Sequence, residues 1–237
     1  VAAADVVINF AGAGVGDRRW TPSYQELIRS SRVLGTSLLA RTLAELEDGH
    51  QVLVQGSAVG WYGHRGSVAL EEDEPAGEGF LARVVVDWEA ATAAAGAAGV
   101  RVALARTGIV LSRSGGAFGK LLPLARLGVA GPLGPGTQFW PWISLTDEVR
   151  ALTFLLDTEV CGPVNLTAPV PETCAHLVHA LARKLHRPSV LRVPGWALRV
   201  ALGGFAGELL ASQRAVPEVL ESHGFTFEQP TLDAALD

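Results

Sequence analysis

The chain has 237 residues, of which 49% are hydrophobic and 18% charged, and its formal net charge is −5. This composition excludes a disordered chain. An acidic chain without a basic cluster is also a poor candidate for nucleic-acid binding. No apolar run reaches the roughly 18 residues of a membrane span, and the cysteines Cys161 and Cys174 are too few for a disulfide framework. We therefore expect a reduced, cytoplasmic protein with no membrane partner.

In the first half of the chain, apolar runs ending at glycine alternate with helical patterns. Residues 5–10 predict a buried strand that closes at glycines. Thr21 and Pro22 then open a helix that is expected to run to about Leu46 and to stop at residues 48–49. Two more strands are predicted at 51–55 and 100–105, with a helix at 80–95 between them. This order predicts a parallel α/β sheet with right-handed crossovers.

The second half of the chain has a different composition and pattern of predicted elements. Residues 113–145 are rich in glycine and proline. Thr146 is expected to cap a helix through Leu156, and a short strand is expected at 164–167. Three or four short helices, a strand at 224–227 and a terminal helical turn follow. We therefore divide the chain into an α/β domain at 1–170, with a substrate-side insertion near 113–145, and a small, mostly helical domain at 171–237.

Two glycine clusters follow the first two strands, at residues 12–16 and 56–63. A dinucleotide fingerprint needs G-x-G-x-x-G leading directly into a helix, whose N-terminus then meets the pyrophosphate. In the first cluster the third glycine comes one residue early, and residues 17–20 precede the helix. The second cluster leads into a charged loop. Neither is the fingerprint, although glycine at a strand end permits close approach of a ligand.

Other residues that could carry chemistry also have ordinary structural interpretations. Ser57 is one place too early for the G-x-S-x-G elbow of a hydrolase. His176 and His179 share a predicted helix face, but no third metal ligand is evident, so no metal site is expected. Trp140 and Trp142 lie in the glycine- and proline-rich segment, where they line a pocket or belong to the core. The sequence leaves these two readings of the tryptophans open.

Several motifs follow one another in the order of a known family; they lie at 9–12, 31–36, 57–63, 87–89, 106–112, 162–166 and 224–227. On these motifs the chain resembles the atypical extended short-chain dehydrogenase/reductases named NAD-dependent epimerase family proteins, or nucleoside-sugar epimerases. The resemblance implies a Rossmann-type doubly wound parallel sheet with a small C-terminal domain of unknown function. It also implies three earlier strands with a G-x-x-G-x-x-G loop, because the first strand here matches the family's fourth.

The resemblance further implies that the strand ends hold a cofactor and a small-molecule substrate. The expected cofactor is NADP(H), with NAD(H) as the alternative. Ser57 and Tyr62 are the candidate catalytic residues, and Tyr62 with the two tryptophans is expected on the substrate side. The candidate cofactor-binding residues flank the nicotinamide half; they are Ala11, Gly12, Arg32, Ser57, Ala58, Val59, Arg106, Thr107 and Gly108.

The chain also departs from the family pattern. Active extended members use a Tyr-x-x-x-Lys pair on the helix after the fifth strand, but residues 80–95 contain neither tyrosine nor lysine. The corresponding positions lie near Leu81 and Val85. Without a titratable group there, the usual proton relay cannot operate. Three hypotheses follow: an oxidoreductase-like protein of unknown substrate, a non-catalytic nucleotide-sensing or interaction module, and an epimerase that uses Tyr62.

Arg32 stands where the family usually has asparagine. Its planar fork of donors suits a phosphate or a carboxylate, so an anionic substrate or cofactor group is expected beside it. A buried guanidinium without an anion is costly. We therefore expect an acidic neighbour such as Asp17, or a bound anion. Arg29 is placed on the outer face of the same helix.

Overall fold

A four-stranded parallel sheet forms the centre of the computed structural model, which describes residues 4–46 and 52–237. The strand order is β1–β2–β4–β8, and every neighbouring pair is parallel. The strands are β1 (Val6–Asn9), β2 (Val52–Ala58), β4 (Arg101–Thr107) and β8 (Gly162–Leu166). The predicted parallel sheet is therefore confirmed. The helix stop predicted at 48–49 lies outside the described residues.

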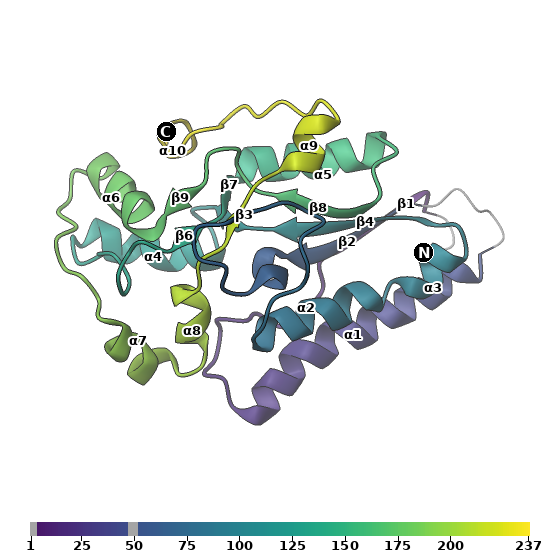
Figure 1. The fold of residues 1–237 in the computed structure, drawn as a ribbon, viewed down its shortest axis with the longest axis horizontal. Coiled ribbons are helices and arrows are strands. Elements are labelled where there is room, and N and C mark those ends of the chain that lie inside the picture. The colour runs from purple at the N-terminus through teal and green to yellow at the C-terminus, as the bar shows by residue number, and fades with distance from the viewer. Residues whose placement is uncertain (1–3, 47–51) are drawn as a thin grey trace.

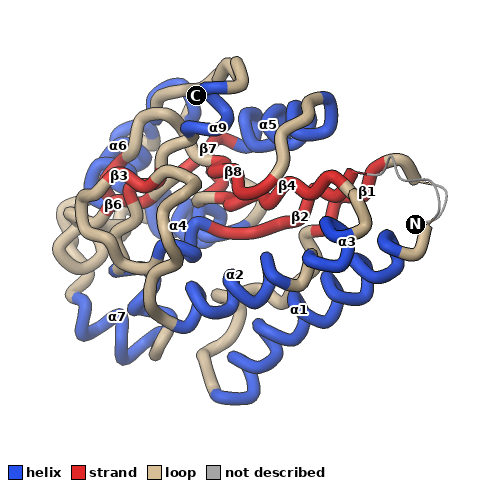
Figure 2. Tube along the Cα trace, turned by 45° about the vertical axis from the view of Figure 1, so that its right-hand side comes forward, coloured by secondary structure: helices blue, strands red, loops and turns tan. Residues whose placement is uncertain are grey.

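Helices cover both faces of this sheet (Figures 1 and 2). One face carries α1 (Pro22–Ala44), α2 (Phe80–Ala90) and α3 (Ala93–Ala97), and the other carries α5 (Leu145–Asp157) and α9 (Glu218–Ser222). This is the expected doubly wound arrangement. Within the described ranges, no helix is both long and apolar enough to cross a bilayer.

The start of α1 follows the predicted capping pattern. The Thr21 hydroxyl accepts a hydrogen bond from the Tyr24 backbone N–H at 3.2 Å, and Pro22 occupies the first helical turn. The helix predicted at 80–95 is instead interrupted between α2 and α3. At the break, the Thr92 hydroxyl donates to the Glu89 carbonyl at 2.7 Å. A threonine side chain that bonds nearby backbone competes with the helical ladder, which accounts for the break.

The two central strands run further than predicted. Parallel pairing continues past Gly56, with Ser57 opposite Arg106 and Ala58 opposite Thr107. These four residues were expected in loops after the strands, and they lie in the sheet instead. Because side chains alternate between the two faces of a strand, their directions are fixed by the sheet.

The remaining elements gather mainly beyond one end of the sheet (Figure 1). They include a 3-10 turn at Val59–Tyr62 and three short two-stranded ladders. In the first, β3 (Ala69–Leu70) pairs with β10 (Arg214–Ala215). In the other two, β5 (Ile109–Leu111) pairs with β7 (Trp142–Ser144), and β6 (Phe139–Trp140) pairs with β9 (Glu172–Thr173). The helices are α4 (Gly116–Arg126), α6 (Cys174–Lys184), α7 (Gly195–Leu202), α8 (Phe205–Leu210) and α10 (Leu232–Ala235).

Three details of the second half differ from the predictions. Helix α4 was not expected, because its glycines and Pro123 obscure the apolar pattern. Helix α5 is capped by Ser144, whose hydroxyl accepts from the Asp147 N–H at 3.0 Å, and not by Thr146. Residues 224–227 form no strand. Instead Phe225 packs edge-on against Phe154 and Phe227, which holds this segment by side-chain contacts.

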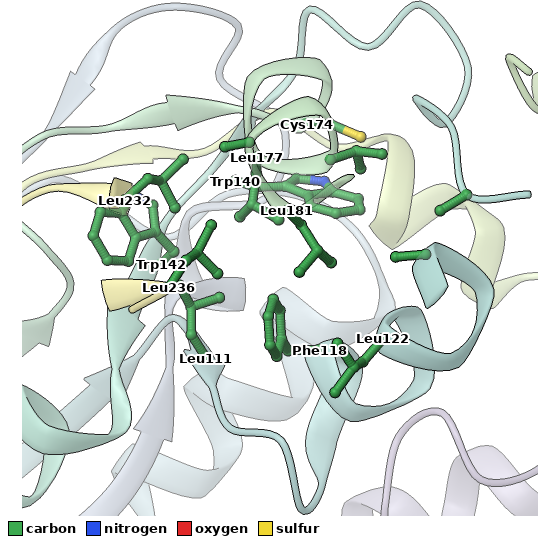
Figure 3. Close-up of a cluster of buried hydrophobic side chains, with 14 of the residues drawn as sticks. Leu111, Phe118, Leu122, Trp140, Trp142, Cys174, Leu177, Leu181, Leu232 and Leu236 are labelled. Carbon is green, nitrogen blue, oxygen red and sulfur yellow. The ribbon is translucent and has the colours of Figure 1, made fainter. Parts of the chain in front are cut away.

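Trp140 and Trp142 belong to the core. Figure 3 shows both rings inside a cluster of apolar side chains from α4, α6 and α10. Their exposed fractions are 8% and 1%. Their indole N–H groups donate to the carbonyls of Leu209 and Val170 at 3.0 and 3.1 Å. Of the two interpretations that the sequence left open, the core is confirmed, and the placement on the substrate side is wrong. A buried indole with its N–H satisfied is a favourable core group.

The same cluster contains Leu111 and Phe118 from the first predicted domain and Leu177 and Leu181 from the second. Residues on either side of position 170 thus share one apolar core. The domain boundary at 170 stays a prediction.

Candidate functional site

The candidate site lies at the carboxyl ends of β2 and β4, where the predicted residues divide between two faces of the sheet. On the face covered by α1 and α2, the Ser57 hydroxyl donates to Glu89 of α2 at 2.5 Å. On the opposite face, the Thr107 hydroxyl donates to Glu148 of α5 at 2.9 Å. Arg106 is the register partner of Ser57 on the neighbouring strand and shares its face, since both side chains bond Glu89. Each face therefore carries its own carboxylate-centred cluster.

Glu89 is the centre of a buried network on the α2 face. Its carboxylate accepts hydrogen bonds from Arg106 Nε at 2.9 Å and from Nη2 at 3.0 Å, in addition to Ser57. Arg106 is only 2% exposed. Burial opposes the guanidinium charge, but the hydrogen bonds and charge of Glu89 outweigh it and raise the pKa of Arg106. A bidentate pair of this geometry is among the strongest side-chain contacts in proteins.

The remaining Arg106 donor extends this network to Tyr62 and Glu72. Nη1 donates to the Tyr62 hydroxyl at 3.1 Å and to the Glu72 carbonyl at 3.0 Å. The guanidinium carbon also lies 4.1 Å from the centre of the Trp61 ring, a favourable cation–π distance. All three nitrogens of this side chain are therefore engaged, which favours a structural role over the predicted contact with a cofactor.

Tyr62 is fully buried, with an exposed fraction of 0%. Its hydroxyl donates to Asn165 Oδ1 at 2.8 Å and accepts from Arg106. Burial raises the pKa of the phenol, against the opposing effect of the Arg106 charge. A buried hydroxyl with both roles engaged is poorly placed for proton exchange with a substrate, so the geometry does not favour the predicted acid/base role.

The loop after β1 is held by side chains of α1. Ser31 Oγ accepts from the Ala13 N–H at 3.0 Å, and Arg32 Nη1 donates to the Ala13 carbonyl at 2.8 Å. The Tyr24 hydroxyl donates to the Gly14 carbonyl at 2.6 Å. A Cβ atom on Gly12 would lie 3.0 Å from Arg32 Cγ and Cζ, closer than ordinary contacts. The Ser31-Arg32 motif thus shapes the strand end that carries Ala11 and Gly12.

Arg32 is half-buried and lies over an aromatic ring. Its guanidinium carbon is 5.0 Å from the centre of the Trp88 ring, and burial lowers the pKa of Arg32. Among the described residues no carboxylate lies within ion-pair distance of it. Asp17, the predicted acidic neighbour, pairs with Lys120 at 3.1 Å instead, so that expectation is wrong. The half-buried charge is left with backbone carbonyls as its hydrogen-bond partners.

Arg29 takes the predicted outward position. It forms an exposed ion pair with Asp87 at 2.7 Å. It therefore serves as a matched comparison for Arg32, one turn away on the same helix.

The residue after β4 closely approaches the link between β6 and β7. A Cβ atom on Gly108 would lie 2.6 Å from the Pro141 carbonyl oxygen, so only glycine fits there. A cavity of about 280 Å³ begins at this glycine; it is lined by Gly108, Ile109, Val110, Ser112, Gly115, Gly116 and Ala117. The carboxyl end of β4 thus has open space beside it for part of a ligand.

Leu81 and Val85 lie near the positions at which the resemblance predicts the family's tyrosine and lysine. A Cβ atom on Gly60 would lie 3.6 Å from Leu81 Cβ and 3.8 Å from Val85 Cγ2. Both residues thus approach the turn that follows β2, and neither can transfer a proton.

Glu148 is a candidate functional residue that the sequence analysis missed. It is 6% exposed, and Thr107 is its only side-chain hydrogen-bond partner among the described residues. The second carboxyl oxygen, Oε2, is buried without a partner. Burial raises the pKa of this carboxyl to about 7, and the Thr107 hydrogen bond opposes the rise only in part. The sequence did contain a signal for this residue, because Glu148 is an acidic residue in the first turn of a helix face that is otherwise apolar.

No metal centre emerges in the described parts of the chain, which contain no group of three or more His, Cys, Asp or Glu side chains arranged to hold an ion. The two histidines that share a helix face have separate partners. His176 contacts Glu172, and His179 bonds Ser189 Oγ at 2.7 Å.

A doubly wound parallel sheet with glycine-rich strand ends defines a protein of the Rossmann class. Residues 1–166 match the model of the NAD dependent epimerase/dehydratase family, and residues 193–237 match a domain of unknown function, DUF1731. The chain therefore belongs to the NAD-dependent epimerase/dehydratase family.

Curated relatives match nearly the whole chain. Epimerase family protein Mb2239 of Mycobacterium bovis is 44% identical over 234 residues, which cover 98% of this chain and 77% of the relative. Epimerase family protein SH2119 of Staphylococcus haemolyticus is 36% identical over 235 residues, covering 98% and 78%.

Two solved structures are similar as well. Human epimerase family protein SDR39U1 (isoform 2), crystallised with NADPH, superposes with a TM-score of 0.95 at 32% identity and covers 100% of this chain and 81% of the human one. A nucleoside-diphosphate sugar epimerase of Corynebacterium glutamicum gives a TM-score of 0.78 at 36% identity, covering 98% and 45%.

Proposed function

We propose that this chain is an NADP(H)-binding, short-chain dehydrogenase/reductase-like protein, an oxidoreductase or epimerase that acts on a small molecule. The observation that carries the proposal is its similarity, along the whole chain, to the human protein that was crystallised with NADPH. NAD(H) is the alternative cofactor. A cytoplasmic location stays a prediction.

The residues at the sheet edge fit such a cofactor. Arg32 is a half-buried cation with no carboxylate partner among the described residues, and this arrangement suits a phosphate group. Gly12 and Gly108 let the strand ends pack closely against Arg32 and Pro141, where a Cβ would collide, and the cavity that Gly108 lines provides the open space beside this edge. We therefore propose that the cofactor lies along this edge; the residues that line it are Ala11, Gly12, Arg32, Ala58, Val59, Thr107 and Gly108.

The remaining predicted residues are given supporting roles in this proposal. The Ser57 hydroxyl donates its hydrogen bond to Glu89, so toward a ligand it offers only an acceptor. Arg106 and Tyr62 hold β4 and the turn after β2 in place from within the protein. When bound, the reduced nicotinamide supplies a hydride. The chain's own residues orient the ligand and handle protons.

A second candidate function is a nucleotide-sensing module without catalysis. The apolar pair Leu81 and Val85, in the place of the usual tyrosine and lysine, favours it. Adding NADPH and a panel of aldehydes and ketones separates the two functions. Cofactor oxidation by any member supports the oxidoreductase. A raised melting temperature with NADPH but no oxidation supports the sensing module.

Arg32→Ala is expected to weaken NADPH binding by at least about tenfold, because a charge-assisted hydrogen bond to a phosphate is lost. Arg32→Lys should restore binding only in part, since lysine lacks the planar fork. Titration calorimetry measures both variants, and Arg29→Ala is the matched control from the exposed face of α1. Equal affinities of Arg32→Ala and Arg29→Ala for NADPH would contradict this role.

A further inference from the structure

Thr107 and Glu148 form a hydroxyl–carboxyl pair on the face of the sheet opposite the Glu89 network. Thr107 is the last residue of β4 and is partly exposed, and its neighbour Gly108 begins the 280 Å³ cavity. Glu148 lies behind it in the first turn of α5, 94% shielded from solvent, with Thr107 Oγ1 2.9 Å from its Oε1. The pair thus joins the strand edge to a buried acid.

The surroundings of Glu148 leave its charge largely uncompensated. On its own helix, Asp147 accepts from Arg150 and from the N–H groups of Glu228 and Gln229. From β4, Arg101 reaches the carbonyls at the far end of α5, and Arg106 points to the other face. The strands β2, β5 and β7, which also pack against α5, contain no titratable side chain.

The unpartnered oxygen shows that this carboxyl is not fully satisfied as a structural group. A buried carboxylate oxygen without a donor is costly, and the protonated form removes the buried charge. Consistent with this, burial raises the pKa of Glu148 to about 7. The acid therefore holds a proton that it can release near neutral pH, which is the range in which a general acid is most effective.

We propose that Thr107 and Glu148 act as a proton relay for a ligand carbonyl or hydroxyl group at the end of β4, in place of the absent tyrosine and lysine. Thr107 is the group that touches the substrate oxygen. Glu148 is a positioning and proton-storing residue that acts through Thr107. This inference rests on the proposed binding of NADP(H) and a carbonyl substrate at the same edge.

The step balances in the direction of reduction. Bound NADPH would supply a hydride to the carbonyl carbon, which would convert the C=O double bond to a C–O single bond. In the protonated form of Glu148 the hydrogen bond is reversed, so that the carboxyl donates to Thr107 Oγ1 and the Thr107 proton is turned toward the ligand. The Thr107 hydroxyl then gives its proton to the carbonyl oxygen, and its own oxygen takes the proton of Glu148. NADPH is oxidised, the carbonyl is reduced to an alcohol, and Glu148 is left ionised until it regains a proton from water.

The test is single-turnover oxidation of NADPH by an aldehyde and ketone panel between about pH 5 and 9. The wild type is expected to be fastest below pH 7 and to slow as Glu148 ionises. Glu148→Gln and Thr107→Val should both be slower by about 100-fold, within the range of general acid catalysis. Glu148→Gln should also lose the pH step near 7, and Thr107→Ser should retain most of the rate. Thr153→Val is the matched control, because its hydroxyl only bonds a carbonyl within α5.

Two further measurements keep the outcome interpretable. NADPH affinity by calorimetry should change less than threefold in Glu148→Gln, and a carboxyl NMR titration should find a group near 7 that this variant lacks. Turnover with an unchanged pH profile in Glu148→Gln overturns the relay but leaves the proposed function intact. NADPH binding without any turnover overturns the relay and favours the sensing module. Absence of NADPH binding overturns the proposed function and the relay together.

Discussion

Replacing Glu89 by alanine is expected to lower the free energy of unfolding by about 3–5 kcal/mol, the cost of breaking a buried ion pair by removing one partner. Arg106 is 2% exposed in the wild type, and the variant leaves this buried guanidinium without its bidentate acceptor. The Ser57 hydroxyl loses its acceptor as well. Urea denaturation followed by circular dichroism measures the difference from the wild type.

Asp87→Asn, two residues away, is the control for this prediction. Its carboxylate pairs with Arg29 at the surface, where solvent screens the interaction. The urea midpoint of Asp87→Asn should therefore move far less than that of Glu89→Ala. The double variant Glu89→Leu, Arg106→Leu should recover part of the lost stability, because no buried charge is then left alone. A Glu89→Ala midpoint no lower than that of Asp87→Asn would show that the network carries little stability.

The stability of the wild type is expected to fall by about 3 kcal/mol as the pH rises from 4.5 to about 7, through Glu148 alone. The carboxyl has a pKa of about 7 in the folded protein against 4.5 when exposed. Between these values the folded state holds the proton and the unfolded state does not, so the free energy of unfolding decreases as pH rises. Above about pH 7 both states are ionised, and this contribution stays constant.

Glu148→Gln isolates that contribution, because the amide keeps the shape of the side chain and never ionises. The difference in unfolding free energy between variant and wild type should grow in favour of the variant from pH 4.5 to 7. Urea midpoints at about pH 5 and pH 8 measure it. A difference that is the same at both pH values would mean that Glu148 titrates normally.

The sequence predicted the sheet, the parallel direction of its strands and the start of α1, because these features depend on local patterns. Apolar runs that end at glycine mark buried strands. Thr21 and Pro22 mark a helix start whatever the rest of the chain does. The family motifs added the cofactor class, and they also led to the two-domain division, which stays a prediction.

The site itself depends on contacts between distant segments, which periodicity does not reveal. Glu89 and Arg106 are 17 positions apart, and Thr107 and Glu148 are 41 apart. The strands were also predicted too short. That error concealed the alternation that sends Ser57 and Arg106 to one face and Thr107 to the other. Reading the period of two through positions 57–58 and 106–107 would have separated the two clusters.

The central claim, that this chain binds NADP(H) at the carboxyl edge of its sheet, is tested most directly by calorimetric titration of the folded protein with NADPH and with NADH. Saturable one-to-one binding of NADPH, weakened by Arg32→Ala and not by Arg29→Ala, is the expected result. Heats of dilution alone with both nucleotides, from protein that unfolds cooperatively in the same buffer, would contradict the claim.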